Sequence, residues 1–527
     1  MDHASILRLM HCPALAAAGE QAPVLRETHI SWVILAGELA YKIKKPLDFG
    51  FLDFSTLERR RFFCEQELAL NRRFAPELYQ AVVPITREAH GPSLDGRGTV
   101  IDYAVRMRRF DERQLLSNIA ARGQLDRALV RALGQELARQ QAAASACYPD
   151  AEAAQAGSPA SLRAAIVQNF AQARGYALQP AEQQLLAEVE DWTLARLRQL
   201  TPLLVQRAAS GHVLDGHGDA HLGNIALVDG RVRLFDCVEF NPGMRIMDGI
   251  AEIAFLCMDL QARGHRRECH WLLGDYLEYR GDYAGLALLD LYRSYYAMVR
   301  AKVALLREPA GNPDLAAGDA YREFSRYLQL ARRYAGHPPA FLAITHGVSG
   351  SGKSTVADRL AGAAGALRIR SDVERKRLFG LAPEQRSAPG DEARLYGSAM
   401  SRRTFDRLAA LTEQIVAAGF AVIVDATFLQ RAGRSRFSRL AQRLRVPYVI
   451  IDCVAPQDEV RRRLQQRDRQ GNDASEAGVA VMLGQLARAE PLTARERACR
   501  VEANSTEGAD ELWARLAQGL RRPAPAD

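Results

Sequence analysis

The sequence lacks any run of roughly 18 uncharged apolar residues, the length that a membrane-spanning helix needs. Its opening stretch, MDHASILRLMHCPALAAAGE, lacks the basic segment and long apolar run of a secretory signal. It also lacks CxxC pairs and the Cys/His spacing of metal sites, and its 8 cysteines are scattered. These absences predict a cytoplasmic protein that has no membrane partner and keeps its cysteines as reduced thiols.

The composition is that of an ordinary folded protein, with 48% hydrophobic and 25% charged residues. A chain of 527 residues exceeds what one hydrophobic core normally organises, so two or three domains are expected. The net charge of +8 lies entirely after residue 340, where 30 Lys and Arg stand against 22 Asp and Glu. Such an excess suits a polyphosphate ligand or nucleic acid, and equally a solvated arginine-rich surface.

A break in the pattern near residue 336 predicts the main domain boundary. The stretch AGHPPA interrupts a helical pattern just before a new apolar strand. We therefore expect a first domain over residues 1–335, a linker over 336–340 and a second domain over 341–527. Up to about residue 105 the pattern is strand-rich with one helix, whereas residues 112–335 are mostly helical with one hairpin.

The stretch HGDAHLGNIALVDGRVRLFD gathers carbonyl-bearing side chains at controlled spacing. Its strands IALV and RVRLF are joined by Asp229 and Gly230, a pair that favours a tight hairpin because both residues tolerate positive φ. The hairpin should bring Asn224 and Asp236 side by side, where their oxygens can share Mg²⁺. Asp219 would face the same space. It is the candidate catalytic base, which would take the proton of an acceptor hydroxyl. Each residue taken alone would equally suit a turn or a cap.

These residues resemble the catalytic loop of the aminoglycoside phosphotransferase family, relatives of protein kinases, whose loop reads HGDxHxxN. In that family the metal aspartate lies one hairpin later. The resemblance implies a bilobal kinase-like fold over about residues 20–335 that uses ATP and Mg²⁺. It implies that Asp219 is the catalytic base and that Asn224 and Asp236 are the magnesium ligands.

The same resemblance implies an ATP-phosphate lysine on a strand of the small lobe. In LAYKIKKP we assign Lys42 to this role, with Lys44 as the competing choice. A helix glutamate should hold the lysine, and in FFCEQELAL we prefer Glu65 to Glu67. A lysine-rich strand edge that is merely solvated is the alternative.

Two features depart from the kinase pattern. ETHISWV stands where a protein kinase has a glycine-rich phosphate loop, so Thr28, His29 and Ser31 would have to contact phosphate through hydroxyls and backbone N–H groups. The metal aspartate is followed by Cys237, so the glycine that follows it in protein kinases is missing, as it also is in antibiotic kinases. Further along, Asp248 and Glu252 are expected to brace the catalytic loop, unless they are surface acids.

A second phosphate-binding signature, GVSGSGKST, fits the pattern GxxxxGK[ST] between an apolar strand at 341–345 and a helical pattern. Its glycines let backbone N–H groups curl around phosphates, and the helix N-terminus adds a favourable dipole. The lysine should span the β- and γ-phosphate oxygens, and Ser354 should reach Mg²⁺. The expected ATP-binding residues are Gly347, Ser349, Gly350, Ser351, Gly352, Lys353, Ser354 and Thr355.

Three features downstream complete this second site. AVIVDATF is a buried strand that ends in Asp425, which should support Mg²⁺ or its water and complete a doubly wound sheet. RIRSDVERKRLFG places Asp372 just past a strand, where it can fix the acceptor hydroxyl or take its proton, or else cap a helix. The helix EVRRRLQQRDRQGNDAS resembles the arginine-bearing lid of small P-loop kinases. Arg467 is the preferred lid residue, beside Arg463 and Arg469, and solvated surface arginines are the alternative.

Residues 341–527 resemble the gluconate kinase, zeta toxin and polynucleotide kinase group, with DATF and Arg434 as the shared detail. The whole order resembles an uncharacterised bacterial fusion family. The fold class expected is α/β and α+β: a bilobal protein-kinase-like domain, then a P-loop domain with a parallel doubly wound sheet. The expected function is transfer of the γ-phosphoryl group of ATP, at two sites, to hydroxyl groups of small molecules. Two alternatives stay open: a regulatory first domain without catalysis, or a P-loop domain that phosphorylates nucleic-acid ends.

Overall fold

The computed structural model describes most of the chain. The described residues are 1–16, 22–50, 52–89, 91–144, 155, 157–309, 312, 315–336, 339–388, 390–470, 475 and 477–521. Among their helices, none combines the length and the apolar character that crossing a bilayer requires. The described cysteines are free thiols.

The chain forms two compact units that interleave in sequence. The first unit contains residues 1–125, 140–168 and 197–259, and the second contains 126–139, 169–196 and 260–527. The linker expected at 336–340 therefore lies within the second unit, and residues 337 and 338 fall outside the described part. The domain boundary stays a prediction.

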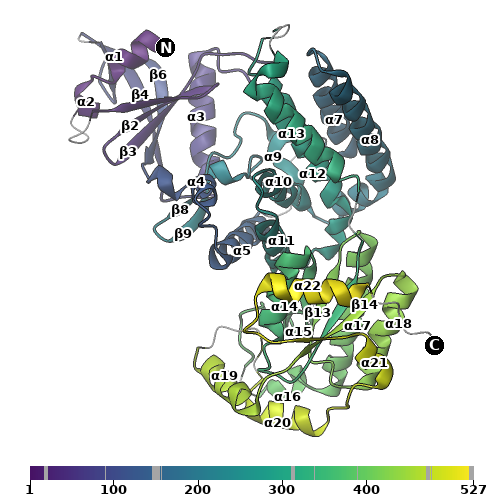
Figure 1. Ribbon diagram of the computed structural model, residues 1–527. Coiled ribbons are helices and arrows are strands. Elements are labelled where there is room, and N and C mark those ends of the chain that lie inside the picture. The colour runs from purple at the N-terminus through teal and green to yellow at the C-terminus, as the bar shows by residue number, and fades with distance from the viewer. Residues whose placement is uncertain are drawn as a thin grey trace. The chain divides into compact units, whose positions relative to one another are not determined.

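The first unit begins with a six-stranded antiparallel sheet in the order β1-β2-β3-β6-β4-β5. Its strands are Val24–Glu27 (β1), Ser31–Ala36 (β2), Leu39–Lys44 (β3), Tyr79–Glu88 (β4), Gly91–Leu94 (β5) and Thr99–Arg108 (β6). Helix α3, Leu57–Asn71, packs against β4 and β6 (Figure 1). The predicted strand-rich section is confirmed; the short helices α1 (His3–Leu9) and α2 (Pro13–Ala16) precede it without a signal in the pattern.

The predicted hairpin is confirmed by β8 (Ile225–Val228) and β9 (Arg231–Leu234), which pair antiparallel. Asp229 has φ 49° and Gly230 has φ 73°, the positive values that the turn requires. A second small pair, β7 (Val213–Asp215) with β10 (Ile246–Asp248), brackets the catalytic loop in sequence. The remaining elements here are η1 (Glu112–Gln114), α4 (Leu116–Ala121), η2 (Leu222–Asn224), α9 (Pro242–Arg245) and α10 (Gly249–Ala262).

Long helices dominate the middle of the chain, as the sequence predicts. Those that run from one unit into the other are α5 (Arg127–Ala143), α7 (Pro159–Arg174), α8 (Pro180–Ala209) and the end of α10. The second unit adds α11 (Arg266–Arg280), η3 (Tyr283–Gly285), α12 (Leu286–Leu305), η4 (Leu315–Ala317) and α13 (Asp319–Arg333). Helices α12 and α13 pack along each other through buried faces.

The second unit ends in a five-stranded parallel sheet in the order β12-β13-β11-β14-β15. Its strands are Leu342–His346 (β11), Leu367–Arg370 (β12), Val422–Asp425 (β13), Tyr448–Cys453 (β14) and Arg500–Ala503 (β15). The three central strands, β13, β11 and β14, are mainly apolar, as expected for strands covered on both faces, whereas the edge strands β12 and β15 also carry charged residues. Helices α14 (Lys353–Ala364) and α22 (Ala509–Leu520) share one core with the sheet, and α17 (Ser398–Ala417) and α18 (Arg431–Leu444) also pack on it (Figure 1). The predicted fold class is confirmed.

The strand order leaves the carboxyl ends of β11, β12 and β13 at one edge of this sheet. Predicted site residues lie in the loop after β11, in the helix after β12 and at the end of β13 itself. The shorter elements around that edge are α15 (Ser371–Phe379), α16 (Glu392–Leu395), α19 (Gln457–Gln470), α20 (Val479–Ala487) and α21 (Ala494–Ala498). Ligand sites in open parallel sheets lie at such an edge.

Candidate active sites

Lys42 on β3 contacts two carboxylates that come from different elements. Its Nζ lies 2.8 Å from Oε1 of Glu67 on α3, and it also forms an ion pair with Asp236, which follows β9. The Lys42 side chain is 11% exposed and that of Glu67 is fully buried. Although burial alone would lower the pKa of Lys42, these carboxylates hold it well above its usual range. The ammonium group is therefore charged and joins sheet, helix and hairpin, as a lysine that binds ATP phosphates requires.

The expectation that Glu65 holds the lysine is wrong. Glu65 is half exposed and pairs with Arg61 one turn earlier on the surface of α3, at 2.9 Å. Glu67 instead belongs to the buried face of α3, which includes Cys64 and Asn71. Residues two apart on a helix point to different sides, so only one of the two glutamates can face the sheet. The spacing of Glu67 from Cys64 and Asn71 is the signal that distinguishes it.

Lys44, the competing candidate, is buried and holds carboxylates rather than facing an opening. Its Nζ lies 2.7 Å from Oε2 of Glu67, and it also pairs with Glu239. The ring of Phe54 lies 4.7 Å from the same nitrogen. Its side chain is only 1% exposed, so Lys44 fixes Glu67 from the side opposite Lys42. No pattern in the sequence indicated Glu239, because it meets Lys44 only in the folded chain.

The catalytic loop brings Asp219 and Asn224 together. Nδ2 of Asn224 donates to Oδ2 of Asp219 at 2.8 Å, and the Asp219 side chain is 42% exposed. The backbone N–H of Asp219 donates to Nδ1 of His217 at 3.3 Å. Nε2 of His217 lies 2.9 Å from the carbonyl oxygen of Phe235, so a neutral ring with the proton on Nε2 satisfies both contacts. Burial lowers the pKa of His217, which favours this neutral form.

Of the two acids expected to brace the catalytic loop, Glu252 on α10 contacts the loop, whereas Asp248, the last residue of β10, holds Arg207 on α8. Oε1 of Glu252 accepts the backbone N–H of His217 at 2.5 Å, and Oε2 accepts Nε2 of Gln141 at 2.9 Å. Asp248 accepts two hydrogen bonds from the Arg207 guanidinium, at 2.7 and 2.8 Å. Both acids are buried, so the alternative of solvated surface acids is wrong.

Asn224 and Asp236 stand at the two ends of the hairpin, as the sequence predicts. The backbone N–H of Phe235 donates to the carbonyl oxygen of Asn224 at 3.0 Å, which extends the pairing beyond the strands. Asp236 adopts φ 62°, a left-handed conformation that is rare outside glycine, and its side chain is 43% exposed. Because Asn224 uses Nδ2 to contact Asp219, its Oδ1 is the atom that can bind a cation.

This donor set fits Mg²⁺ held together with a triphosphate. Among the described residues, no three His, Cys, Asp or Glu side chains cluster tightly enough to form a metal centre of their own. Mg²⁺ usually keeps several waters and binds one or two protein oxygens plus substrate phosphates. The amide oxygen of Asn224 and the carboxylate of Asp236 would be the protein ligands of the Mg²⁺ ion.

The turn that replaces a glycine-rich loop is closed by its own side chains. The backbone N–H of Ser31 donates to Oγ1 of Thr28 at 2.9 Å, and the N–H of Thr28 donates to the carbonyl oxygen of Ser31 at 2.9 Å. These two N–H groups are therefore engaged within the turn between β1 and β2. The expectation that Thr28 and Ser31 offer them to phosphate is wrong for this conformation.

The P-loop of the second unit follows β11 and ends at the first residue of α14. Gly347, Gly350 and Gly352 have φ of 135°, 84° and 93°, which side-chain-bearing residues rarely adopt. A Cβ on Gly347 would lie 2.7 Å from the carbonyl oxygen of Cys453, so the loop also needs glycine for close packing. Nζ of Lys353 donates to the carbonyl oxygen of Val348 across the loop at 2.6 Å. The predicted strand-loop-helix arrangement is confirmed.

A cavity of about 1270 Å³ opens at the P-loop. Its lining contains these predicted residues: Ser349, Gly350, Gly352, Lys353, Ser354, Thr355, Asp372, Asp425 and Arg463. Gly347 and Ser351 belong to the loop without lining the cavity, and the Ser351 hydroxyl is buried without a hydrogen-bond partner. The side chain of Arg467, in α19, lies outside the described residues. The volume suits a nucleotide together with a second molecule.

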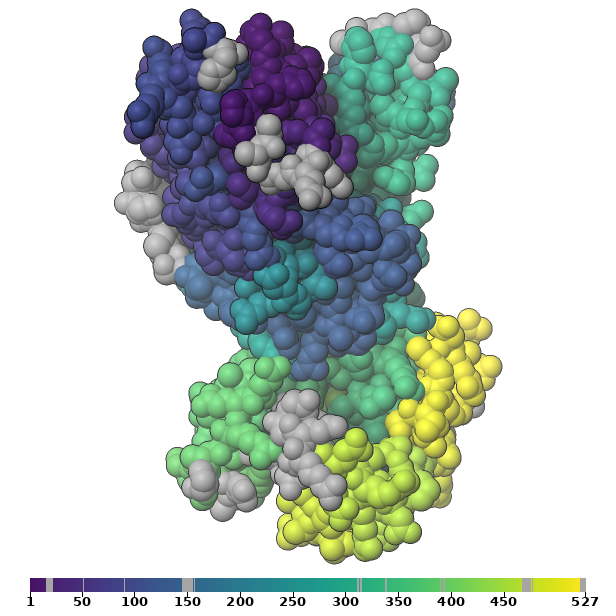
Figure 2. Space-filling view, turned by 90° about the vertical axis from the view of Figure 1, so that its left-hand side faces the viewer, coloured from purple at the N-terminus to yellow at the C-terminus, as the bar shows by residue number. Residues whose placement is uncertain are grey.

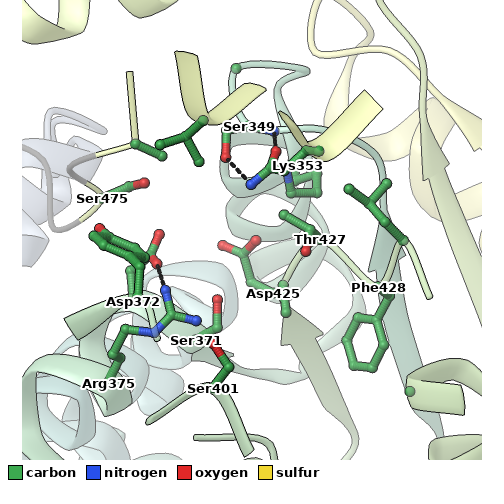
Figure 3. A pocket seen from close by; sticks show the side chains of 18 of the residues that line it. Ser349, Lys353, Ser371, Asp372, Arg375, Ser401, Asp425, Thr427, Phe428 and Ser475 are labelled. Atoms are coloured by element: carbon green, nitrogen blue, oxygen red, sulfur yellow. Dashed lines mark hydrogen bonds and ion pairs between the residues drawn. The ribbon is translucent and has the colours of Figure 1, made fainter. Parts of the chain in front are cut away.

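Asp425 at the end of β13 points into this cavity. It lies between Lys353 on one side and Asp372 with Arg375 on the other (Figure 3). The residue is 5% exposed, and its Oδ2 has no hydrogen-bond partner. A buried carboxylate oxygen without a partner is costly unless a ligand, water or cation satisfies it. The donor set of Asp425 and Ser354 therefore fits Mg²⁺ bound with phosphates.

Asp372 lies in the first turn of α15 and lines the same cavity. Its Oδ1 is 3.3 Å from the guanidinium of Arg375, one turn later, as Figure 3 shows. The alternative of a helix cap is wrong, because the cap residue is Arg370 and no side chain caps this helix. Asp372 is thus available to an acceptor hydroxyl.

Basic side chains dominate the lining beyond the P-loop. Figure 2 shows green segments near residue 400 and yellow-green segments near residue 460 on opposite sides of the face it presents. Both segments contribute to the cavity, whose acidic lining residues are Asp372 and Asp425. The lining arginines are Arg370, Arg375, Arg402, Arg436, Arg463 and Arg488. The cavity therefore favours anionic ligands.

Gln485 on α20 was not singled out by any pattern and contacts the P-loop directly. Its Oε1 accepts the backbone N–H of Ser349 at 2.8 Å, and its Nε2 donates to Oγ of Ser349 at 3.1 Å. A polar helix residue 136 positions away carries no local signal for such a contact. Gln485 thus links α20 to the P-loop in the wall of the cavity.

Arg434, the detail shared with the P-loop kinase group, is fully buried and structural. It donates to both carboxylate oxygens of Glu496, at 2.7 and 3.2 Å. It also donates to the carbonyl oxygens of Phe428, Leu429, Glu490 and Pro491. Arg434 therefore ties the loop after Asp425 to the segment before α21.

Residues 342–492 match the profile of a family described as "AAA domain". Over 474 residues the chain is 31% identical to the uncharacterized protein Rv2004c of Mycobacterium tuberculosis, which covers 90% of this chain and 91% of the relative.

Two solved structures each resemble part of the chain. A choline/ethanolamine kinase family protein from Mesorhizobium loti is 14% identical, covers 62% of this chain and 97% of that one, and has a TM-score of 0.36. A sugar kinase from Janibacter is 20% identical, covers 34% and 95%, and has a TM-score of 0.27. Because both TM-scores are low, the function of this chain has to be judged from its own residues.

Proposed function

This chain belongs to the same family as the uncharacterized mycobacterial protein Rv2004c, and on that premise we propose that it is a phosphotransferase with two sites for Mg-ATP. Each site would transfer the γ-phosphoryl group to a hydroxyl of a small molecule. The observation that carries the proposal is the cavity at the P-loop, which joins Lys353, the unpartnered Oδ2 of Asp425 and Asp372 in one space. A triphosphate, its cation and an acceptor need these three features together.

At the P-loop site, the loop N–H groups and Lys353 would bind the β- and γ-phosphates. Ser354 and Asp425 would hold Mg²⁺, which neutralises charge on the phosphoryl oxygens during transfer. Asp372 would orient the acceptor hydroxyl and take its proton, while Arg375 fixes the carboxylate. Arg463 lines the cavity from α19 and would contact phosphate oxygens after release from Glu459, which it pairs with at 2.8 Å.

At the first site, Lys42 would bind ATP phosphates while Glu67 anchors it. Asn224 and Asp236 would hold Mg²⁺, and Asp219 would take the proton of the acceptor hydroxyl. Asn224 and His217 position Asp219 through its carboxylate and its backbone N–H. Lys42 would have to exchange its contact with Asp236 for phosphate when Mg-ATP binds, since the Asp236 carboxylate and the phosphate compete for the same ammonium group.

A specific observation favours one alternative for the first unit. The turn between β1 and β2 uses the N–H groups of Thr28 and Ser31 internally, so this turn offers less to a triphosphate than a glycine-rich loop does. A regulatory nucleotide site without transfer is therefore the second candidate for this unit. It predicts that Asp219 is dispensable for every activity of the chain.

The test is a screen of hydroxyl-bearing metabolites and oligonucleotide ends for ATP consumption by the full chain. Wild type is compared with Asp219→Asn, Lys353→Ala and the control Asp229→Asn, which changes an exposed turn residue. Two active sites predict that the first two variants abolish different activities and the control abolishes none. If only Lys353→Ala matters, the first unit is regulatory. The proposal is contradicted if neither Asp219→Asn nor Lys353→Ala abolishes any activity.

A further inference from the structure

The backbone of Asp236, the carboxylate expected to hold Mg²⁺ at the first site, is left-handed, with φ 62°. This conformation is uncommon for a residue with a side chain, and it persists only where surrounding groups fix it. Two peptide planes meet at the Cα atom of Asp236. One carries its own N–H group, and the other carries the N–H group of Cys237. Contacts that fix both planes therefore fix φ and ψ of Asp236, and with them the direction in which its side chain leaves the backbone.

The peptide plane before Asp236 is held at both of its polar groups. The N–H of Asp236 donates to the hydroxyl oxygen of Tyr79 on β4 at 3.0 Å. The carbonyl oxygen of Phe235 lies 2.9 Å from Nε2 of His217. Tyr79 is only 2% exposed, and burial beside the carboxylates of Glu67 and Asp236 holds its pKa well above its usual range. The phenol is therefore neutral, and its oxygen accepts the N–H of Asp236.

The peptide plane after Asp236 is held from α3. The N–H of Cys237 donates to Oδ1 of Asn71, the last residue of that helix, at 2.8 Å. Nδ2 of Asn71 donates to the carbonyl oxygen of Glu67, one turn earlier, at 2.9 Å, and this second contact fixes the orientation of the amide. Asn71 and Cys237 are both fully buried, so loss of Oδ1 would leave a buried N–H group without an acceptor.

The backbone N–H groups of residues 235–238 all have acceptors within the protein. The outer two donate to backbone carbonyl oxygens, at 3.0 and 3.1 Å, whereas the middle two donate to the side chains of Tyr79 and Asn71. A substitution can therefore remove either of the two middle acceptors. Asn71 follows Glu67, the anchor of Lys42, by four residues, and residues so spaced share one face of a helix. One face of α3 thus fixes both the phosphate-binding lysine and the backbone of the metal aspartate.

We propose that Asn71 and Tyr79 are positioning residues of the first site, which hold Asp236 in its left-handed conformation whether or not nucleotide is bound. This inference rests on the proposed function and concerns the metal ligand of that site. Protein groups make all the contacts described above, so these contacts need no ligand to form. A ligand that is oriented in advance binds a cation at a lower entropic cost, and the outer partners that orient metal ligands contribute about tenfold or more to metal affinity.

The first test is hydrogen exchange in the full chain without nucleotide, followed by mass spectrometry of a peptide that contains residues 235–238. The variants are Tyr79→Phe and Asn71→Leu, each first checked by thermal unfolding. The matched control is Tyr41→Phe, which removes a buried hydroxyl from β3 of the same sheet but in a different hydrophobic core. We expect the peptide to be protected in wild type and in the control, and to exchange about fivefold faster or more in both variants.

The second test measures the effect on the metal. AMP-PNP is titrated with and without Mg²⁺ into the same chains, each of which also carries Lys353→Ala so that the P-loop does not contribute. A merely structural loss would weaken binding equally under both conditions, whereas a misdirected Asp236 weakens chiefly the binding with Mg²⁺. We expect the enhancement by Mg²⁺ to fall by about fivefold or more in Tyr79→Phe and Asn71→Leu, and to stay within about twofold in Tyr41→Phe.

The inference is overturned if the wild-type peptide exchanges freely until Mg-AMP-PNP is added, or if both variants keep the enhancement by Mg²⁺. An effect of Tyr41→Phe as large as that of Tyr79→Phe would overturn it as well. Should Asn71→Leu fail to fold, Tyr79→Phe decides alone, because it removes a single oxygen atom. Failure of AMP-PNP to bind the Lys353→Ala chain removes the proposed function of the first site together with this inference. Binding whose enhancement by Mg²⁺ is unchanged in the variants removes only the inference.

Discussion

Nζ of Lys44 lies 2.7 Å from Oε2 of Glu67, while the other oxygen of the same carboxylate holds Lys42 at 2.8 Å. One buried glutamate therefore serves two lysines, and only Lys42 also reaches Asp236. The position of Lys42, the lysine proposed to bind ATP, therefore depends on Glu67, which Lys44 holds in place.

Replacement of Glu67 by Gln should weaken Mg-ATP binding at the first site by about tenfold or more, because Lys42 loses its buried anchor. It should also lower the free energy of unfolding by about 3 kcal/mol, since it leaves buried positive charge undercompensated. Calorimetry and urea unfolding measure the two effects. The matched control is Glu65→Gln on the surface of the same helix, which should change neither. Equal effects of the two variants would contradict the role of Glu67.

A pH-dependent loss of stability should originate at His217. Burial lowers the pKa of this histidine from its ordinary value of 6.5, so the unfolded chain binds the proton first. Its contribution to stability is intact above pH 6.5 and is lost as the pH falls through that value towards the folded-state pKa. The loss amounts to at most about 1.4 kcal/mol per pH unit.

The measurement is urea unfolding of wild type and His217→Asn between pH 7.5 and 5. We expect a smaller slope in the variant. The slope should not vanish, because His270, whose pKa is lowered to about 4 mainly by desolvation, remains. An unchanged slope would show that His217 is not held neutral in the folded chain.

Arg434→Met should destabilise the P-loop domain by about 3 kcal/mol or more, because it strands Glu496 and several buried carbonyl groups. Arg434→Lys should recover little of this loss, since an ammonium cannot reproduce the forked contacts of a guanidinium. Thermal unfolding measures both. The control is Arg436→Met on the same helix α18, whose partner Asp406 is exposed. A surface pair of this kind contributes at most about 1 kcal/mol.

Asp425→Asn should preserve the fold and reduce the Mg²⁺ dependence of nucleotide binding at the P-loop. The variant keeps the shape of the side chain but removes the charge that would support the cation. Titrations of AMP-PNP with and without Mg²⁺ measure the difference, with Asp406→Asn on the exposed face of α17 as the control. If Mg²⁺ enhances binding equally in wild type and Asp425→Asn, this carboxylate does not support the metal.

The sequence predicted those parts of the sites whose geometry is local. The hairpin that joins Asn224 to Asp236 follows from the turn residues Asp229 and Gly230, and the P-loop follows from its glycine spacing between a strand and a helix. In each case the interacting groups belong to one short continuous segment, so chain geometry alone brings them together.

Contacts between distant segments were not predictable in the same way. The choice between Glu65 and Glu67 depends on which face of α3 meets the sheet, and Gln485 meets Ser349 across 136 positions of sequence. Such pairs are set by tertiary packing, and a single sequence carries no local trace of them.

The central claim is that the chain has two separate sites for Mg-ATP, one around Lys42 and one around Lys353. Calorimetric titration of the full chain with Mg-AMP-PNP tests it most directly, with wild type, Lys42→Ala and Lys353→Ala compared at equal protein concentration. We expect two bound nucleotides per chain for wild type and one for each variant. A single bound nucleotide in wild type that Lys353→Ala removes and Lys42→Ala leaves unchanged would contradict it.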